Sequence, residues 1–156
     1  MIPYGRQEIN QDDIDAVTDV LRSDFLTQGP LVPAFEKAVM EYCSVKYAFA
    51  VNSATSALHI ACMALEVGNN DVVWTSPISF VASSNSLLYA GYKPEFIDID
   101  PNSLNLDLKL VKARVELNNE VKAILPVHFA GLPCDMERIS EIANDHDLKI
   151  IEDAAH

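Results

Sequence analysis

Segments typical of buried strands alternate with segments typical of helices along most of this 156-residue chain. Short apolar runs bounded by turn residues predict strands at 47–51, 72–75, 95–99, 121–127 and 149–152. Apolar residues at helical spacing predict helices between these strands, at 55–66, 81–89, 107–115 and 136–144. Because strands that alternate with helices of this length build βαβ units, the sequence predicts an α/β fold. Its sheet is mostly parallel and is flanked by helices.

Two further helices are predicted before the first strand. Helical spacing follows acidic first-turn residues over 12–22 and resumes over 32–42, and Gln28-Gly29-Pro30 breaks the chain between them. No internal repeat or linker interrupts the pattern. With 49% hydrophobic residues, a chain of this length indicates one domain or part of one.

The chain is strongly acidic, with 23 Asp and Glu residues against 11 Lys and Arg residues. Nucleic acids and anionic membranes are polyanions, so this charge argues against either as the main partner. The apolar stretches are far shorter than a membrane span, and the amino end lacks the apolar core of a signal peptide. Three dispersed cysteines are typical of a reducing compartment, so we expect a soluble, cytoplasmic protein.

Small hydroxylated residues, Ser53-Ala54-Thr55-Ser56, join the first predicted strand to its helix. Such residues are typical of a plain N-cap, which accepts a hydrogen bond from a free amide. They are also typical of a phosphate site, where first-turn amides, hydroxyls and the helix dipole hold the anion. The segment lies at the carboxyl end of a predicted parallel strand, where α/β proteins bind ligands, and this position favours the phosphate site.

A carboxylate, Asp153, follows the last predicted strand. It either caps the segment that comes next or opposes a cationic group in a buried site. In a site that holds a phosphate cofactor, a pyridinium nitrogen would be such a group, because an aspartate keeps that ring protonated. Glu152 points the opposite way along the strand, and we expect it to face solvent or to be paired.

The remaining candidate residues have ordinary structural interpretations. Spacing alone predicts that Phe80 is a core residue and that His59 packs within its helix. Neither His128 nor His146 has a partner at metal-ligand spacing, so no metal site is predicted. The chain also lacks the residue order of a hydrolytic triad and a nucleophile elbow.

Six segments, in this order, resemble the DegT/DnrJ/EryC1/StrS family of sugar aminotransferases, which have fold type I and use pyridoxal 5'-phosphate. They are Leu26-Thr27-Gln28-Gly29-Pro30, Asn52-Ser53-Ala54-Thr55-Ser56-Ala57-Leu58-His59, Ser76-Pro77-Ile78-Ser79-Phe80-Val81-Ala82, Phe96-Ile97-Asp98-Ile99-Asp100, Pro126-Val127-His128-Phe129-Ala130-Gly131 and Ile151-Glu152-Asp153-Ala154-Ala155-His156. The resemblance implies that residues 1–156 are the amino-terminal portion of the large, cofactor-binding domain.

The resemblance also implies roles in cofactor binding. Ala54 and Thr55 would bind the phosphate, Phe80 would stack on the pyridine ring, and Asp153 would bond the ring nitrogen. His156 stands where the family has Gln or His near the phenolic oxygen of the ring.

For the substrate, the resemblance implies that Thr27 and Gly29 lie in a loop that approaches it. The Ser53-Ala54-Thr55 segment, where the family usually has Ser-Gly-Thr, is similar to the subgroup that aminates a UDP-linked 4-keto-6-deoxy hexosamine. The partners would then be a nucleotide sugar and an amino donor, glutamate, and the full-length protein would be a homodimer.

The Schiff-base lysine of the family would lie beyond His156, so we expect no catalytic residue in this chain and no activity from it alone. The family orders its large-domain sheet 3-2-4-5-6-7-1, and strands 6 and 7 and the small carboxyl-terminal domain would also come later. The predicted strand at 47–51, which is strand 1, would then have no neighbour in the sheet.

Two alternatives stay open. One is a non-enzymatic sugar-nucleotide-binding or regulatory domain with the same fold, which a lysine beyond His156 would argue against. The other is an unrelated α/β enzyme such as a dehydrogenase. The absence of a Gly-x-Gly-x-x-Gly turn argues against this second alternative.

Overall fold

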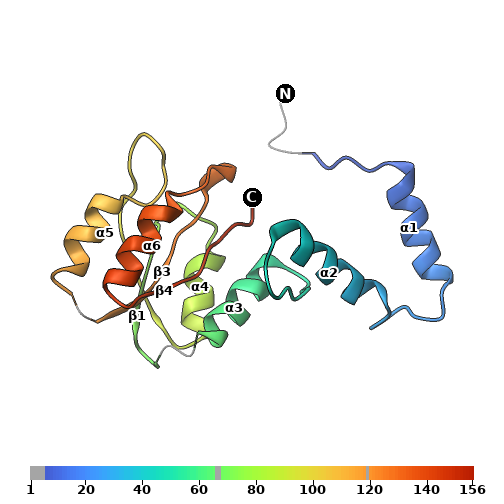
Figure 1. Cartoon of the computed structure of the whole chain (residues 1–156), viewed down its shortest axis with the longest axis horizontal. Coiled ribbons are helices and arrows are strands. Elements are labelled where there is room, and N and C mark those ends of the chain that lie inside the picture. Colours follow the sequence, from blue (N-terminus) through green and yellow to red (C-terminus); the bar gives the residue numbers. More distant parts are fainter. Residues whose placement is uncertain (1–5, 66–67, 119) are drawn as a thin grey trace. The chain divides into compact units, whose positions relative to one another are not determined.

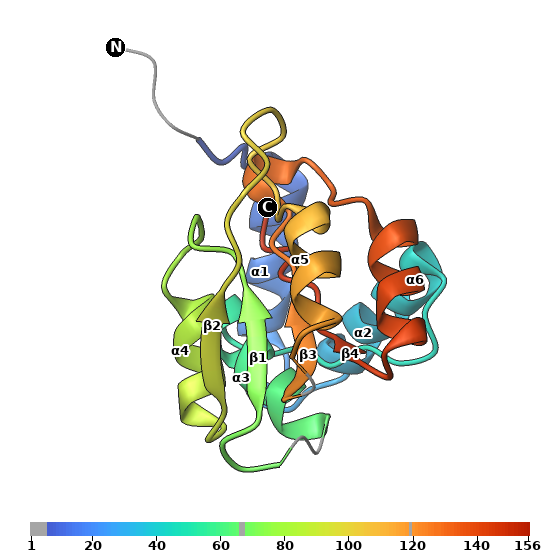
Figure 2. The ribbon, with the colours of Figure 1, turned by 90° about the vertical axis from the view of Figure 1, so that its left-hand side faces the viewer.

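The computed structural model describes residues 6–65, 68–118 and 120–156, and the chain divides into two compact units, Met1–Ala50 and Val51–His156. The second unit contains one four-stranded sheet in the order β2-β1-β3-β4 (Figure 2). Its strands are β1 (Val72–Thr75), β2 (Lys93–Phe96), β3 (Val121–Leu125) and β4 (Lys149–Ile150). All three pairings are parallel, which confirms the predicted sheet type. The order equals the 3-2-4-5 part of the order that the resemblance implies.

Helices cover both faces of this sheet (Figure 1). One face packs against α5 (Leu108–Val115) and α6 (Met136–Asp145), and the other packs against α3 (Ala54–Ala64) and α4 (Ala82–Tyr89). The side chains of β1 alternate between these layers, because successive residues of a strand point to opposite faces. Trp74 belongs to the cluster of α5 and α6, and Val73 belongs to that of α3 and α4. The predicted α/β architecture is therefore confirmed.

Side-chain caps fix where two of these helices begin. Asp107 accepts hydrogen bonds from the amides of Lys109 and Leu110 at the start of α5, at 2.8 and 3.4 Å. Asp135 accepts one from the amide of Arg138 at the start of α6, at 3.1 Å. These bonds satisfy amides that have no partner within the helix. Among the described residues, no helix has both the length and the apolar character needed to cross a membrane.

The first unit holds two amphipathic helices, α1 (Gln11–Arg22) and α2 (Leu31–Cys43). Asn10 and Asp13 form a capping box at the start of α1, and each side chain accepts a hydrogen bond from the other residue's amide. Both predicted helices are confirmed. No residue among 6–50 is buried, however, and the apolar face of α1 is open to solvent, with Leu21 66% exposed.

The predicted strand at 47–51 is wrong, because the structure has no strand there. The backbone amide of Ala50 donates to Glu36 Oε1 at 2.8 Å, and the Phe49 side chain is 80% exposed. A strand needs a neighbour for its backbone groups, and no described strand pairs with this segment.

The other strands differ from the prediction only at their ends. The strand predicted at 95–99 is observed as β2 (Lys93–Phe96), since pairing to β1 begins at Lys93. Lys93 and Pro94 do not look like strand residues, but β2 is an edge strand, where lysine and proline are tolerated. β3 and β4 end earlier than predicted, and α3 ends at Ala64. The last residue of the helix predicted at 55–66 lies outside the described residues.

Candidate functional site

The candidate site lies at the carboxyl edge of the sheet, which is the edge where all four parallel strands end. A segment leaves this edge after each strand, and three of these segments carry the residues of the site: 76–81 after β1, 126–131 after β3 and 151–156 after β4. The amino ends of α3 and α4 face the same edge, because each helix runs opposite to the strand that it adjoins. Leu58 of α3 accordingly packs in one cluster with Val127 and Ile151.

Asp153 is the most buried charged residue of this edge, at 7% exposure. Its amide donates to the Pro126 carbonyl at 2.9 Å and its carbonyl accepts from the His128 amide at 3.1 Å, so the parallel pairing continues past β4. Its side chain accepts two hydrogen bonds. The Ser83 hydroxyl donates to Oδ2 at 2.6 Å, and the Ala155 amide donates to Oδ1 at 3.3 Å.

No cationic group neutralises this carboxylate among the residues that the structure describes. The ion pairs found there are Lys37–Glu41, Lys93–Glu95 and His128–Glu152, and none includes Asp153. A buried charge is costly unless it is paired, and two hydrogen bonds offset only part of that cost. The site therefore fits a ligand that brings a positively charged hydrogen-bond donor to Asp153.

Phe80 is 75% exposed, so the prediction from spacing that it is a core residue is wrong. It stands just before α4, whose buried face consists of Ala82, Ser83, Ser86 and Leu87. An aromatic ring that is bare at this edge is available to stack on a planar ligand.

The amino end of α3 is a capped helix end with two free backbone amides. The Ser53 hydroxyl accepts from the Ser56 amide at 3.2 Å, which confirms the N-cap interpretation for Ser53. The amides of Ala54 and Thr55 make no hydrogen bond within the described part of the chain. Free amides at a helix amino end are the groups that bind phosphate, so phosphate binding by Ala54 and Thr55 is compatible with the cap at Ser53 and stays a prediction.

His128 forms a second polar cluster beside Asp153. The Cys134 amide donates to Nδ1 of His128 at 3.1 Å, and Nε2 lies 3.0 Å from Glu152 Oε2. Nδ1 is thus an acceptor, and the ring proton sits on Nε2 and is donated to Glu152. This confirms the expectation that Glu152 is exposed or paired. The sequence pattern did not predict the pairing of His128 with Glu152, although the two residues follow neighbouring strands.

Burial raises the pKa of the Cys134 thiol next to this cluster. The Glu152 carboxylate also raises this pKa, by the smallest contribution of the three causes. A backbone hydrogen bond lowers the pKa in part. Cys134 Sγ donates to the Val127 carbonyl at 3.3 Å, as a protonated thiol does. Within the described ranges, no group of three His, Cys, Asp or Glu residues could hold a metal ion.

A buried amide, Asn105, shapes the loop after β3 and was not predicted. Its Nδ2 donates to the carbonyls of Leu132 and Pro133, at 3.1 and 3.2 Å, and its Oδ1 accepts from the Phe129 amide at 3.1 Å. The turn at 129–131 contains Gly131 at a φ of 81°, a backbone conformation that residues with a side chain rarely adopt. A Cβ at Gly131 would lie 3.6 Å from the His156 carbonyl, so the loops after β3 and β4 meet here.

The structure brings Phe80 and Asp153 to the carboxyl edge of the sheet. The amino end of α3, which carries Ala54 and Thr55, faces the same edge. His156 is exposed, and its role near the cofactor ring stays a prediction. His59 is half-buried and meets the Tyr89 ring edge-on at 5.7 Å, which confirms that it packs.

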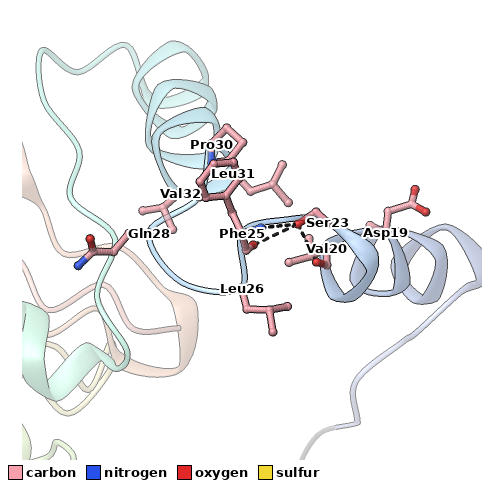
Figure 3. A pocket seen from close by; sticks show the side chains of 11 residues that line it. Asp19, Val20, Ser23, Phe25, Leu26, Gln28, Pro30, Leu31 and Val32 are labelled. Carbon is pink, nitrogen blue, oxygen red and sulfur yellow. Dashed lines mark hydrogen bonds between the residues drawn. The ribbon is translucent and has the colours of Figure 1, made fainter.

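Thr27 and Gly29 belong to the other compact unit, and their predicted contact with substrate stays a prediction. Gly29 lines a cavity of about 500 Å³ between the end of α1 and the start of α2 (Figure 3). A Cβ at Gly29 would lie 2.9 Å from Phe25 Cβ, so a glycine is needed for this close approach. The lining is mainly apolar, with Val20, Leu26 and Leu31 among its members.

Comparison with known proteins shows what this arrangement is similar to. The model of the DegT/DnrJ/EryC1/StrS aminotransferase family matches residues 7–156. The UDP-4-amino-4,6-dideoxy-N-acetyl-beta-L-altrosamine transaminase of Campylobacter jejuni strain 81-176 is 45% identical over 157 residues, which cover 100% of this chain and 41% of that protein.

Two solved structures have closely similar folds. Helicobacter pylori PseC, an aminotransferase involved in the biosynthesis of pseudoaminic acid, has a TM-score of 0.89 and 37% identity. The match covers 96% of this chain and 40% of that one. The PLP-form of the putative sugar aminotransferase Spr1654 from Streptococcus pneumoniae also has a TM-score of 0.89, with 28% identity, and the match covers 99% of this chain and 43% of that one. The chain therefore spans well under half the length of these relatives.

Proposed function

The chain belongs to the DegT/DnrJ/EryC1/StrS aminotransferase family, and from this premise we propose the function of the full-length protein. It transfers an amino group to a nucleotide-linked keto-deoxy sugar and uses pyridoxal 5'-phosphate as cofactor. The sugar is a UDP-linked 4-keto-6-deoxy hexosamine, and glutamate is the amino donor. Support for the substrate comes from the 45% identity to a transaminase of a UDP-linked dideoxy sugar.

The observation that carries this proposal is the buried carboxylate of Asp153, which no cationic side chain pairs among the described residues. A protonated pyridine nitrogen is a cationic donor of the kind that this carboxylate lacks. When bound, the cofactor supplies an electron-withdrawing ring that stabilises negative charge developing on the substrate.

Each residue of the site then has one task. Asp153 keeps the proton on the ring nitrogen, and the exposed ring of Phe80 covers one face of the cofactor and excludes water from it. The free amides of Ala54 and Thr55 hold the phosphate, with help from the dipole of α3. His156 lies near the phenolic oxygen in this proposal.

The proton-transferring lysine would then lie outside residues 1–156, in keeping with the greater length of the relatives. Residues 1–156 are then the amino-terminal portion of the large domain and are inactive by themselves. Thr27 and Gly29 approach the substrate. We also propose a cytoplasmic homodimer, which the family resemblance and the dispersed cysteines support.

The test is an assay of the full-length protein with pyridoxal phosphate, glutamate and a UDP-linked 4-keto-6-deoxy hexosamine. We expect a product aminated at carbon 4, identified by mass and NMR, and one 2-oxoglutarate for each amino sugar. Turnover of dTDP-linked sugars only would show that the substrate assignment is wrong and leave the family assignment intact. A full-length protein that binds the nucleotide sugar but neither binds pyridoxal phosphate nor forms product would be a non-enzymatic domain.

A further inference from the structure

We propose that Ser83 is a positioning residue that fixes the carboxylate of Asp153 for its contact with the cofactor ring. This inference rests on the proposed function, because it concerns the task given to Asp153. Ser83 lies in the first turn of α4 and Asp153 follows β4, so two segments 70 residues apart in the sequence meet at one hydrogen bond. The sequence pattern does not single out Ser83.

The contact has the properties of a strong, protected hydrogen bond. Ser83 Oγ lies 2.6 Å from Asp153 Oδ2, a length typical of a hydroxyl that donates to a carboxylate. Ser83 is 1% exposed and Asp153 is 7% exposed, so water competes little for either group. Low local dielectric strengthens such a bond and raises the cost of losing it.

The hydroxyl of Ser83 has one hydrogen, and besides the Ser79 hydroxyl it has two nearby acceptors. Asp153 Oδ2 is at 2.6 Å, whereas the Phe80 carbonyl is at 3.1 Å. The carboxylate is both nearer and charged, so it takes the hydrogen. The Ser83 oxygen is then free to accept from the Ser79 hydroxyl, with which it is in hydrogen-bond contact. Ser79, Ser83 and Asp153 thus form a chain of hydrogen bonds directed at the carboxylate.

The two carboxylate oxygens of Asp153 are consequently unequal. Oδ2 is anchored to α4 by Ser83, while Oδ1 has only the longer bond of 3.3 Å from the Ala155 amide. Oδ1 is therefore the oxygen that is available to accept a hydrogen bond from a ring nitrogen. Ser83 sets the orientation of the carboxylate and so determines where Oδ1 points.

The same turn links Asp153 to Phe80. The Ser83 amide donates to the Phe80 carbonyl at 3.1 Å, so Phe80 and Ser83 lie in one hydrogen-bonded turn at the start of α4. The residue proposed to cover the ring face and the residue that holds Asp153 are therefore joined by a backbone hydrogen bond. A change at Ser83 acts on the cofactor through Asp153 and not by direct contact.

The experiment uses the full-length protein with Ser83→Ala and Ser83→Thr, and Ser84→Ala as a matched control. Ser84 is adjacent and half-buried, but its hydroxyl donates to the Val81 carbonyl at 3.1 Å and does not contact Asp153. The first readout is the dissociation constant for pyridoxal phosphate from an absorbance titration. The second is the ¹⁵N resonance of cofactor labelled at the ring nitrogen, which reports its protonation.

We expect Ser83→Ala to weaken cofactor binding about tenfold, the effect of losing one hydrogen bond to a buried charge. It should also shift the ¹⁵N resonance toward the unprotonated position. Ser83→Thr keeps the hydroxyl and should restore both values, and Ser84→Ala should change neither. In an Asp153→Asn background, Ser83→Ala should add little, because the two changes act on one contact.

Unchanged binding and an unchanged ¹⁵N resonance in a folded Ser83→Ala protein would overturn the proposal for Ser83. So would an equal effect of Ser84→Ala, or additive effects of Ser83→Ala and Asp153→Asn. If Ser83→Ala does not fold, a ¹⁵N resonance that differs between Ser83→Thr and wild type would also overturn it. Failure of the wild-type protein to bind pyridoxal phosphate is a different result, and it would remove the proposed function itself.

Discussion

The two compact units of the chain contain equally regular helices but bury very different amounts of apolar surface. In residues 51–156, two clusters are buried, one on each face of the sheet: Trp74 and Ile124 belong to one, and Val73 and Leu125 belong to the other. In residues 6–50 no residue is buried, and the apolar side chains of Leu21 and Phe35 are 66% and 61% exposed.

The comparison of α1 with α6 shows what causes this difference. Both helices have a capped amino end and an apolar face at helical spacing. The face of α6 packs on the sheet through Ile142 and Ala143, whereas Ile14 and Val17 of α1 are 50% and 61% exposed. Local sequence is thus enough to set a helix, but burial depends on a second surface.

The largest expected effect concerns residues 1–156 expressed alone. At about 25 cal/mol per Å², a few hundred Å² of bare apolar surface forfeits several kcal/mol. That is comparable with the net stability of a domain, about 5–15 kcal/mol. We therefore expect this chain to aggregate or to form a loose state that binds a hydrophobic dye, with no visible absorbance from added pyridoxal phosphate.

Residues 51–156 provide the matched control, because they lack the exposed faces of α1 and α2. We expect them to bind less dye per molecule in the same fluorescence measurement. A soluble monomer of residues 1–156 with a sharp, cooperative melt would contradict this view of the first unit and favour an independent domain.

The next effect is a difference between a buried and an exposed apolar side chain. In the full-length protein, Ile139→Ala removes a side chain with no exposed surface and should lower the free energy of unfolding by about 2–5 kcal/mol. Leu21→Ala removes a side chain that is 66% exposed in residues 1–156, so it should lower the dye bound by that chain. A denaturant titration measures the first effect and dye fluorescence measures the second. Unchanged dye binding by the Leu21→Ala chain would break the comparison, since it would mean that the apolar face of α1 is not what binds the dye.

The smallest effect is the reactivity of the three cysteines. Cys43 in α2 is exposed, while Cys62 and Cys134 are buried. Burial raises the pKa of the Cys62 and Cys134 thiols, so they hold less of the reactive thiolate at neutral pH. We expect alkylation near neutral pH to modify Cys43 at least about tenfold faster than Cys62 or Cys134. Peptide mass mapping gives the three rates, and equal rates would contradict the burial.

Much of the fold was predictable from the sequence because strand and helix periods differ. β1 lies where it was predicted, and the five helices α1, α2, α4, α5 and α6 lie within a residue or two. The segment at 47–51 has the apolar composition of a strand, but composition does not reveal whether a neighbour is present. The start of β2 at Lys93 was hidden because an edge strand tolerates polar residues and proline.

The candidate site was predictable only in part. The strand-end position of Asp153 and the helix-start position of Thr55 are visible in the sequence, because parallel strands direct their carboxyl ends to one edge. The contacts of Ser83, Asn105 and His128 are not visible, because each joins segments 24 or more residues apart. Their only local signals were polar residues where a helix or loop packs against the sheet.

The substitution Asp153→Asn in the full-length protein tests the central claim most directly. The neutral amide does not hold a proton on the pyridine nitrogen, so cofactor binding should be partly retained while kcat falls by about a hundredfold or more. The measurement is kcat together with the dissociation constant for pyridoxal phosphate, for the variant and the wild type. Collapsed turnover with residual binding is the result that the account predicts, and an Asp153→Asn enzyme with wild-type turnover would contradict it.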